Sequence, residues 1–184
     1  MCPTMAREAK RFHSIAETFQ ATSLRILMRT SSALPKTIAV VRIAASVFFL
    51  LFGEYKIAGP GFAHGGFQAY LQDYIANSAV EFYRPFLSGT VLPHAVFFGY
   101  VVGVLESVIG ICLLLGLWVR FASALGILFL VNMTLATWWA PGHGVPVWRY
   151  FGNELEHLPL LLLMIIFFVA DAGRVWGIDG LLRT

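Results

Sequence analysis

The chain has 184 residues, of which 58% are hydrophobic and only 12% carry a charge. Soluble domains carry a charge on about a quarter of their residues, so this composition indicates an integral membrane protein. The net charge of +3 is too small to suggest a nucleic-acid-binding protein, and two cysteines far apart, Cys2 and Cys112, exclude a disulfide framework.

Residues 1–36 are polar and basic, and they contain no apolar run that is long enough to cross a membrane. Four apolar residues recur there at helical spacings of 3, 4 and 7: Phe12, Ile15, Phe19 and Ile26. This pattern predicts a basic amphipathic helix on the cytoplasmic membrane surface. The alternatives are a frayed tail and a translation start further along the chain. No small-x-small cleavage site follows, so we do not expect a cleaved signal peptide.

The first apolar segment, at about residues 37–57, is long enough to form a transmembrane helix. Arg42 lies near one end of it, and Lys56 lies near the other end on the same helical face. We predict both as substrate-binding residues. For Arg42 the alternative is a side chain that only reaches along the helix to the membrane interface. A long polar and aromatic segment, residues 59–93, follows, and we expect it to lie in the interface or to cap the bundle.

The second apolar segment, residues 95–119, has twenty-five residues and one carboxylate, Glu106, near its centre. Gly99, Gly103, Glu106 and Gly110 are spaced by 4, 3 and 4, so they share one helical face. Glycines allow a neighbouring helix to approach closely, and Glu106 is therefore expected to face protein rather than lipid. Arg42 is the only basic residue of a span that we expect near it, so we expect Glu106 to be mainly protonated at neutral pH. We predict Glu106 as a catalytic proton relay, with a purely structural role as the alternative.

The third apolar segment, residues 121–140, carries Asn132 at about the same membrane depth as Glu106, counted from the turn between the two segments. We therefore predict a contact between Glu106 and Asn132, either within a catalytic site or as a structural hydrogen bond. Trp138 and Trp139 end this segment and are typical of an interfacial aromatic belt. Both are also candidates for the aromatic wall of a substrate site.

A fourth span is expected at about residues 151–170, which places Glu154 and His157 in its outer turns. We predict both as catalytic residues that pass protons toward the outer face of the membrane. Their spacing of three is the Glu-x-x-His element of di-iron bundles, but such sites need two of these elements and the sequence has one. No metal, haem or flavin ligand set is evident.

The positive charges predict the topology. Ten of the thirteen Lys and Arg residues fall in the amino-terminal part up to Arg42, in the turn at 117–120 and in the tail after Asp171. By the positive-inside rule both termini are cytoplasmic. The expected fold is an all-α integral membrane four-helix bundle at residues 37–184, preceded by the cytoplasmic segment 1–36.

Several short motifs then resemble those of the DoxX family. They are Arg42 with Gly53-x-x-Lys56, Glu106-x-x-x-Gly110, Gly116-x-x-x-Arg120 and the closing Gly173-Arg174-x-x-x-Ile178-Asp179. The resemblance covers Arg42 to Asp179 and leans toward members like DoxD, the membrane subunit of thiosulfate:quinone oxidoreductase. It implies a four-helix protein of a bacterial-type inner membrane that works with a partner subunit and, in some members, with quinones.

Two functions of different class follow. In the first, the chain is the membrane subunit of a quinone-linked oxidoreductase and holds a quinone or relays protons near Glu106. In the second, it is a non-catalytic factor that assembles or stabilises a partner membrane protein, and Glu106 only joins helices. The resemblance favours the first, and a homo-oligomer is compatible with either.

Overall fold

The structure is a computed structural model, and it describes residues 33–59, 61–138 and 157–182. The chain divides into two units, Met1–Thr37 and Ile38–Thr184. Of the first unit only residues 33–37 are described, so most of the predicted amphipathic segment lies outside the described residues, as do Trp139 and Glu154. The second unit is described below by itself.

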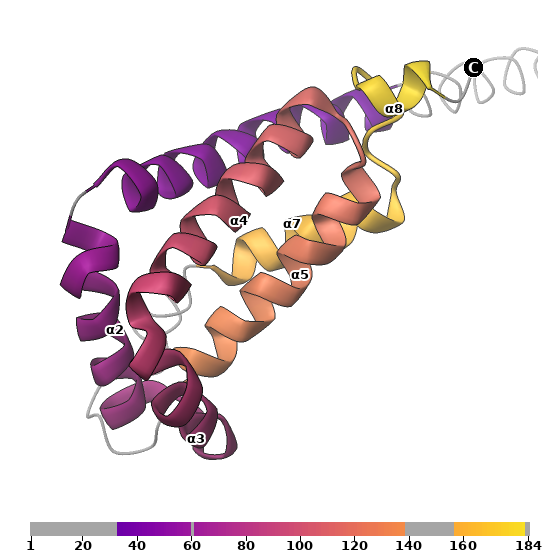
Figure 1. Cartoon of the computed structure of the whole chain (residues 1–184). Helices are drawn as coiled ribbons and strands as arrows, with labels where there is room; N and C mark the ends of the chain where they lie inside the picture. The colour runs from indigo at the N-terminus through magenta and orange to yellow at the C-terminus, as the bar shows by residue number, and fades with distance from the viewer. Residues whose placement is uncertain (1–32, 60, 139–156, 183–184) are drawn as a thin grey trace, which may run out of the picture. The chain divides into compact units, whose positions relative to one another are not determined.

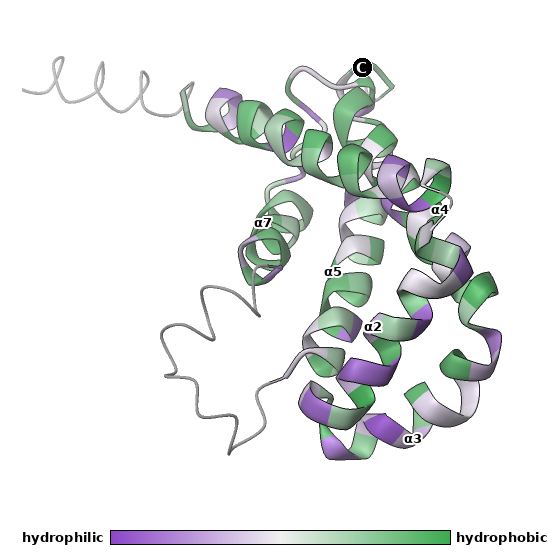
Figure 2. Cartoon of the chain, turned by 90° about the vertical axis from the view of Figure 1, so that its left-hand side faces the viewer, coloured by the Kyte–Doolittle hydropathy of each residue, from purple (hydrophilic) through white to green (hydrophobic). Residues whose placement is uncertain are grey.

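The described residues are helical and contain no strand, so the predicted all-α fold is confirmed. Three helices in them are long and apolar enough to cross a membrane: Ala33–Ala58, Glu81–Leu115, which includes α4 (Ala95–Leu115), and α5 (Val119–Ala136). Hydrophobic residues make up most of these helices (Figure 2), and many of the large ones are exposed, as expected for helices that face lipid.

A fourth apolar helix, α7 (Leu158–Val169), has 12 residues in the described part of the chain. These residues extend roughly 18 Å, which is less than the hydrocarbon core of a bilayer. The helix begins with a proline in its first turn, at Pro159, where the missing backbone N–H has no helical partner to lose. The expected start of this span near residue 151 lies outside the described residues.

The turn between α4 and α5 begins at Gly116, three residues before the expected end of the second apolar segment at Val119. Gly116 has φ +64°, a left-handed conformation that ends α4 at Leu115. The N–H of Leu117 donates to the carbonyl of Cys112 at 3.0 Å, which completes a Schellman-type end of the helix. The turn is therefore set by one glycine, and the helix is shorter than the apolar run.

Residues 61–94 form a series of short helices before α4: η1 (Phe62–Gly66), α2 (Phe67–Asp73), η2 (Tyr74–Ser78), η3 (Glu81–Tyr83), α3 (Arg84–Phe86), η4 (Leu87–Val91) and η5 (Leu92–His94). Ser78 Oγ donates to the Ala136 carbonyl at 3.0 Å, and Val80 N donates to the Leu135 carbonyl at 2.9 Å. These bonds attach the segment to the end of α5. In the second unit α8 (Ile178–Leu181) lies at the opposite end from α2 and α3 (Figure 1).

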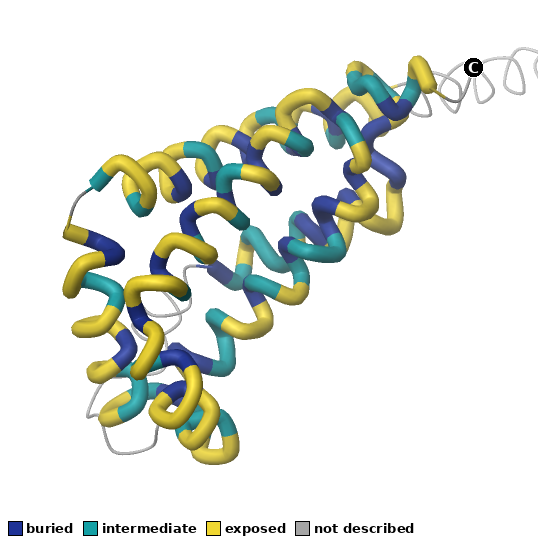
Figure 3. Tube along the Cα trace, viewed as in Figure 1, coloured by how far each residue is buried: buried dark blue, intermediate teal, exposed yellow. Residues whose placement is uncertain are grey.

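The interior of the second unit is apolar and packs through small residues. Its main cluster of buried side chains is contributed by every long helix and comprises Ala45, Phe49, Ile109, Leu113, Val119, Leu130, Met164, Phe167 and Ala172. The face predicted on α4 is buried, because Gly99, Gly103, Glu106 and Gly110 are all buried residues. Figure 3 shows buried and exposed positions alternating along the helices of the second unit. Added Cβ atoms at Gly53 and Gly110 would lie 2.4 Å from Ser107 Oγ and 2.8 Å from Leu50 Cγ. The first helix and α4 therefore pack in contact along these glycines.

Candidate functional site

A buried ion pair joins the first helix to α4. Lys56 Nζ lies 2.5 Å from Oε1 and 2.6 Å from Oε2 of Glu106. The side chains are 16% and 5% exposed, respectively. A Cβ on Gly103 would come within 3.0 Å of the Lys56 Cβ, so this glycine makes room for the lysine. The ammonium supplies the cation that a buried carboxylate needs, and both charges are satisfied by each other.

The Lys56 ammonium also lies over two aromatic rings. Its Nζ is 5.7 Å from the ring centroid of Phe52 and 5.6 Å from that of Phe62. Cation–π attraction of this kind adds to the pairing with Glu106. Two of the three ammonium hydrogens are directed to the carboxylate oxygens, which leaves a third donor on Lys56.

Asn132 does not bond to Glu106 as we predicted, but to Tyr83 and to the Leu128 carbonyl. Tyr83 donates its hydroxyl to Asn132 Oδ1 at 2.5 Å, and Asn132 Nδ2 donates to the Leu128 carbonyl at 2.7 Å. The buried face of α5 passes through Ser123, Gly126 and Leu130, and Asn132 lies off that face in an exposed position. The depth of a residue along a helix does not fix the direction in which its side chain points.

A cavity of about 440 Å³ opens beside the ion pair. Its walls are apolar and come from the first helix, α5 and α7: Phe48, Phe49, Phe52, Phe129, Leu130, Met133, Pro159, Leu160 and Leu163. The polar side chains that line it are Lys56, Glu106 and His157. Cavities of this size with a few convergent polar groups are typical of small-molecule sites.

His157 is held by α5 at the edge of this cavity. Its Nε2 lies 3.1 Å from Thr134 Oγ1, and Thr134 in turn donates to the Leu130 carbonyl at 2.8 Å. His157 is 9% exposed and immediately precedes α7. The residue was predicted from its position in the sequence, whereas its partner Thr134 was not, because a threonine inside an apolar helix usually bonds only to its own backbone.

Arg42 does not line the cavity and belongs to the other end of the second unit. It is fully buried, and its Nη1 and Nη2 donate to the carbonyls of Ala172 and Trp176 at 2.9 and 2.7 Å. Asp179 accepts the backbone N–H groups of Trp118 and Val119 at 2.8 and 2.9 Å. These contacts close the carboxyl-terminal segment over the start of α5, so Arg42 neither reaches the interface as a free side chain nor contacts the cavity.

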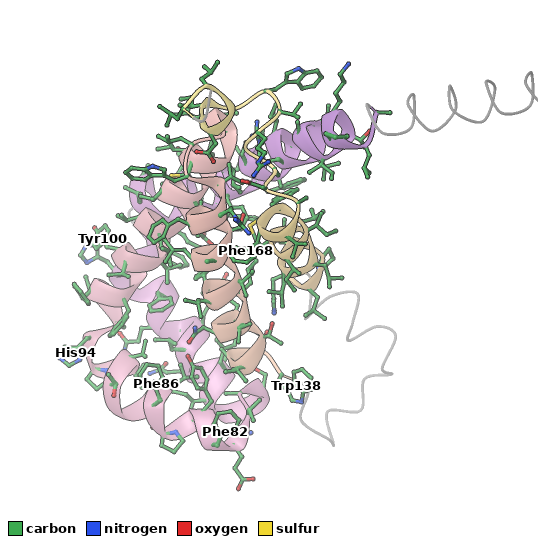
Figure 4. All side chains as sticks on the ribbon, turned by 90° about the vertical axis from the view of Figure 1, so that its right-hand side faces the viewer. Phe82, Phe86, His94, Tyr100, Trp138 and Phe168 are labelled. Carbon is green, nitrogen blue, oxygen red and sulfur yellow. The ribbon has the colours of Figure 1, made fainter. Side chains whose placement is uncertain are left out.

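Of the three other predicted site residues, only Trp138 is described by the structure, and it lies outside the cavity. Trp138, labelled in Figure 4, follows the end of α5, is 48% exposed and is not among the cavity residues. Trp139 and Glu154 lie outside the described residues. The aromatic wall that we sought at the tryptophans is supplied by phenylalanines of the first helix and of α5. In the sequence, Phe49, Phe52 and Lys56 recur at spacings of 3 and 4, which is the signal that identifies this face.

The described residues contain no group of three or more His, Cys, Asp or Glu side chains that could hold a metal ion. The site therefore combines an apolar slot with an ammonium, a carboxylate and an imidazole. Such groups bind an oxygen-bearing head group and exchange protons with it.

The comparisons with known proteins give a family. No curated protein and no solved structure matches the chain. The DoxX family model matches residues 37–140, which is more than half of the chain and contains Lys56, Glu106 and Asn132. The match ends before the expected fourth span and the closing motif, and it does not test the likeness to DoxD. The chain belongs to the DoxX family of membrane proteins.

Proposed function

We propose that the chain is the membrane subunit of a quinone-linked oxidoreductase and that the quinone binds in the cavity beside Lys56 and Glu106. The observation that carries this proposal is the composition of the cavity: a wall of phenylalanine, leucine and methionine side chains that ends on a buried ion pair and on His157. Membership of the DoxX family supports it, because proteins of this family are often linked to quinone oxidoreductases.

The cavity fits a quinone in size and polarity. Its volume of about 440 Å³ lies within the range of small-molecule sites. The apolar wall suits an isoprenoid tail, and the third N–H of Lys56 can donate to a ring carbonyl. When bound, a quinone accepts two electrons and two protons and becomes a quinol. The residues of this chain bind the head group and hold or move the protons, at Glu106 and at His157.

The electrons come from outside the chain on this proposal. A soluble or membrane partner subunit supplies them, since the sequence shows no haem, flavin or iron–sulfur ligand set. A thiosulfate donor would follow from the resemblance to DoxD alone.

The proposed location is a bacterial-type inner membrane with both termini cytoplasmic. The family and the three apolar helices support a membrane protein, and the Lys and Arg distribution supports the orientation. A reporter fused after residue 184 should be active as a cytoplasmic reporter. Activity of a periplasmic reporter at that position would refute the orientation.

Quinone extraction from the purified protein tests the binding site. Leu163 lines the cavity, whereas Leu162 is 61% exposed and is not among the cavity residues. Leu163→Trp should narrow the slot and lower the amount of co-purified quinone per protein by at least about tenfold, which corresponds to about 1.4 kcal/mol of binding free energy. The matched variant Leu162→Trp should retain the wild-type amount. Equal quinone content in both variants would refute the site.

A second pair of variants separates a redox subunit from an assembly factor. Glu106→Gln keeps the shape and removes the charge, and Glu54→Gln makes the same change at an exposed position of the first helix. If Glu106 exchanges protons, well-folded Glu106→Gln protein should lose quinone-dependent turnover while Glu54→Gln protein keeps it. Full turnover in folded Glu106→Gln protein would end the catalytic interpretation and favour a structural pair.

A further inference from the structure

We infer that Thr134 fixes the ring of His157 with its proton on Nε2, which leaves Nδ1 as a hydrogen-bond acceptor at the cavity. The head group bound there is then the quinol, whose hydroxyl groups can donate to Nδ1. The inference deepens the proposed function and rests on it for the identity of the ligand. Its first part, the position of the proton, stands on the geometry of this chain alone.

The position of the proton follows from counting donors. A threonine hydroxyl has one hydrogen, and Thr134 Oγ1 lies 2.8 Å from the Leu130 carbonyl oxygen, which is only an acceptor. The hydroxyl hydrogen therefore belongs to that bond, as is usual for a threonine within a helix. His157 Nε2, 3.1 Å from the same Oγ1, must then be the donor. If Thr134 instead donated its hydrogen to Nε2, lone pairs of Thr134 Oγ1 and of the Leu130 carbonyl oxygen would face each other at 2.8 Å.

The other ring nitrogen is consequently the one that can act on a ligand. A neutral imidazole with its proton on Nε2 has a lone pair on Nδ1. His157 lines the cavity, and within the described part of the chain no side chain bonds to Nδ1 and no carboxylate pairs with the ring. At 9% exposure, a charged ring without an ionic partner is costly. A neutral ring in this tautomer accepts a hydrogen bond and does not donate one to the cavity.

The consequence is a preference between the two redox forms. A quinone carries only carbonyl acceptors, which face the Nδ1 lone pair unfavourably, whereas a quinol carries hydroxyl donors that suit it. Glu106, whose two oxygens are both held by Lys56, is a second acceptor at the same cavity. The third N–H of Lys56 can donate to a carbonyl oxygen of the quinone or to a hydroxyl oxygen of the quinol, so it favours neither form. Thr134 acts through His157 and is therefore a positioning residue. The site is expected to bind quinol more tightly than quinone.

Nitrogen NMR of histidine-labelled protein in detergent tests the first part. Subtraction of the spectrum of a His157→Gln variant assigns the His157 signals. At neutral pH we expect a protonated Nε2 and a bare Nδ1 in the wild type. Thr134→Val should shift the Nε2 signal and Thr134→Ser should restore it. Thr137→Val is the matched control, because Thr137 caps α5 one turn later and donates in the same way to the carbonyl four residues before it, that of Met133, at 2.9 Å. A proton on Nδ1, or on both nitrogens, in the wild type would overturn the inference.

Titration with decylubiquinol and decylubiquinone tests the second part. Decylubiquinol should bind at least about threefold more tightly to the wild type and should move the Nδ1 signal, and Thr134→Val should reduce this preference. Binding of both forms with equal affinity, or binding without a change at Nδ1, would overturn the inference while the proposed function stands. If neither form binds and Nε2 is nevertheless protonated, the proposed function fails and the position of the proton is retained.

Discussion

Removal of the Lys56 charge should destabilise the protein more than any other single change at the cavity. In Lys56→Met the apolar stem is kept, while Glu106, only 5% exposed, loses the ammonium that binds both of its oxygens. Loss of one partner of a buried pair costs on the order of 3–5 kcal/mol, because Glu106 must then either stay charged without compensation or take up a proton. For a chain of this length, such a loss lowers the melting temperature by on the order of 10 °C.

The double variant gives the decisive measurement. In Lys56→Met/Glu106→Leu no charge is left without a partner, and replacing both members of a buried pair by apolar groups is often neutral or stabilising. We expect its melting temperature in detergent to lie well above that of Lys56→Met and near that of the wild type. Glu54→Gln, at an exposed position of the same helix, is the control that should leave the melting temperature unchanged. Additive losses in the double variant would refute the pairing.

Three further outcomes are expected from thermal unfolding of single variants. Gly116→Ala should cost at least about 1–3 kcal/mol, since Gly116 has φ +64° and an added Cβ would lie 2.4 Å from Gly177 Cα; unchanged stability would show that the turn can rearrange. Asp179→Ala should cost about 1–2 kcal/mol through loss of the cap on Trp118 and Val119 without reducing quinone content. Tyr83→Phe should cost roughly 1 kcal/mol by leaving Asn132 Oδ1 without its donor, and a stabilised variant would contradict that bond.

Three features could be predicted because they depend only on composition and on the spacing of residues along a helix. They are the membrane class, the helical fold and the side of α4 that faces protein. Gly99, Gly103, Glu106 and Gly110 are buried together, as their spacing requires. These features depend only on residues near one another in the chain. The family could be recognised for the same reason, since its motifs are local.

The partner of Glu106 could not be predicted by counting depth along the helices. The first helix and α4 are antiparallel, since Leu50 approaches Gly110 while Lys56 approaches Gly103. Side chains on a helix tilt toward its amino terminus, so on antiparallel helices Lys56 and Glu106 tilt toward each other. Two residues whose Cα atoms lie at different depths can therefore meet. A count of 1.5 Å per residue ignores this tilt, and the count pointed to Asn132 without Lys56 being considered as a partner of Glu106.

The site also combines side chains that are far apart in the sequence, which no local pattern reveals. Phe49 and Phe52 belong to the first helix, and Leu163 belongs to α7. The cavity forms only once the first helix, α5 and α7 are packed together, which depends on contacts between residues far apart in the chain. The aromatic residues at the predicted interface were more conspicuous in the sequence, yet Trp138 is not part of the cavity.

The two polar clusters of the second unit differ in whether their charged groups can still bind a ligand. Arg42 donates with both terminal nitrogens to backbone carbonyls, and Asp179 accepts two backbone N–H groups, so these charges close the fold and line no part of the cavity. Lys56 and Glu106 bind each other, are open to the cavity and retain a donor and lone pairs that a ligand can use. A pair that served only to join helices would gain nothing from bordering a 440 Å³ cavity, where a water-filled or ligand-filled space weakens its attraction. The position of this pair beside the cavity supports the proposed binding role, and the variants of Lys56 and Glu106 should separate that role from a structural one.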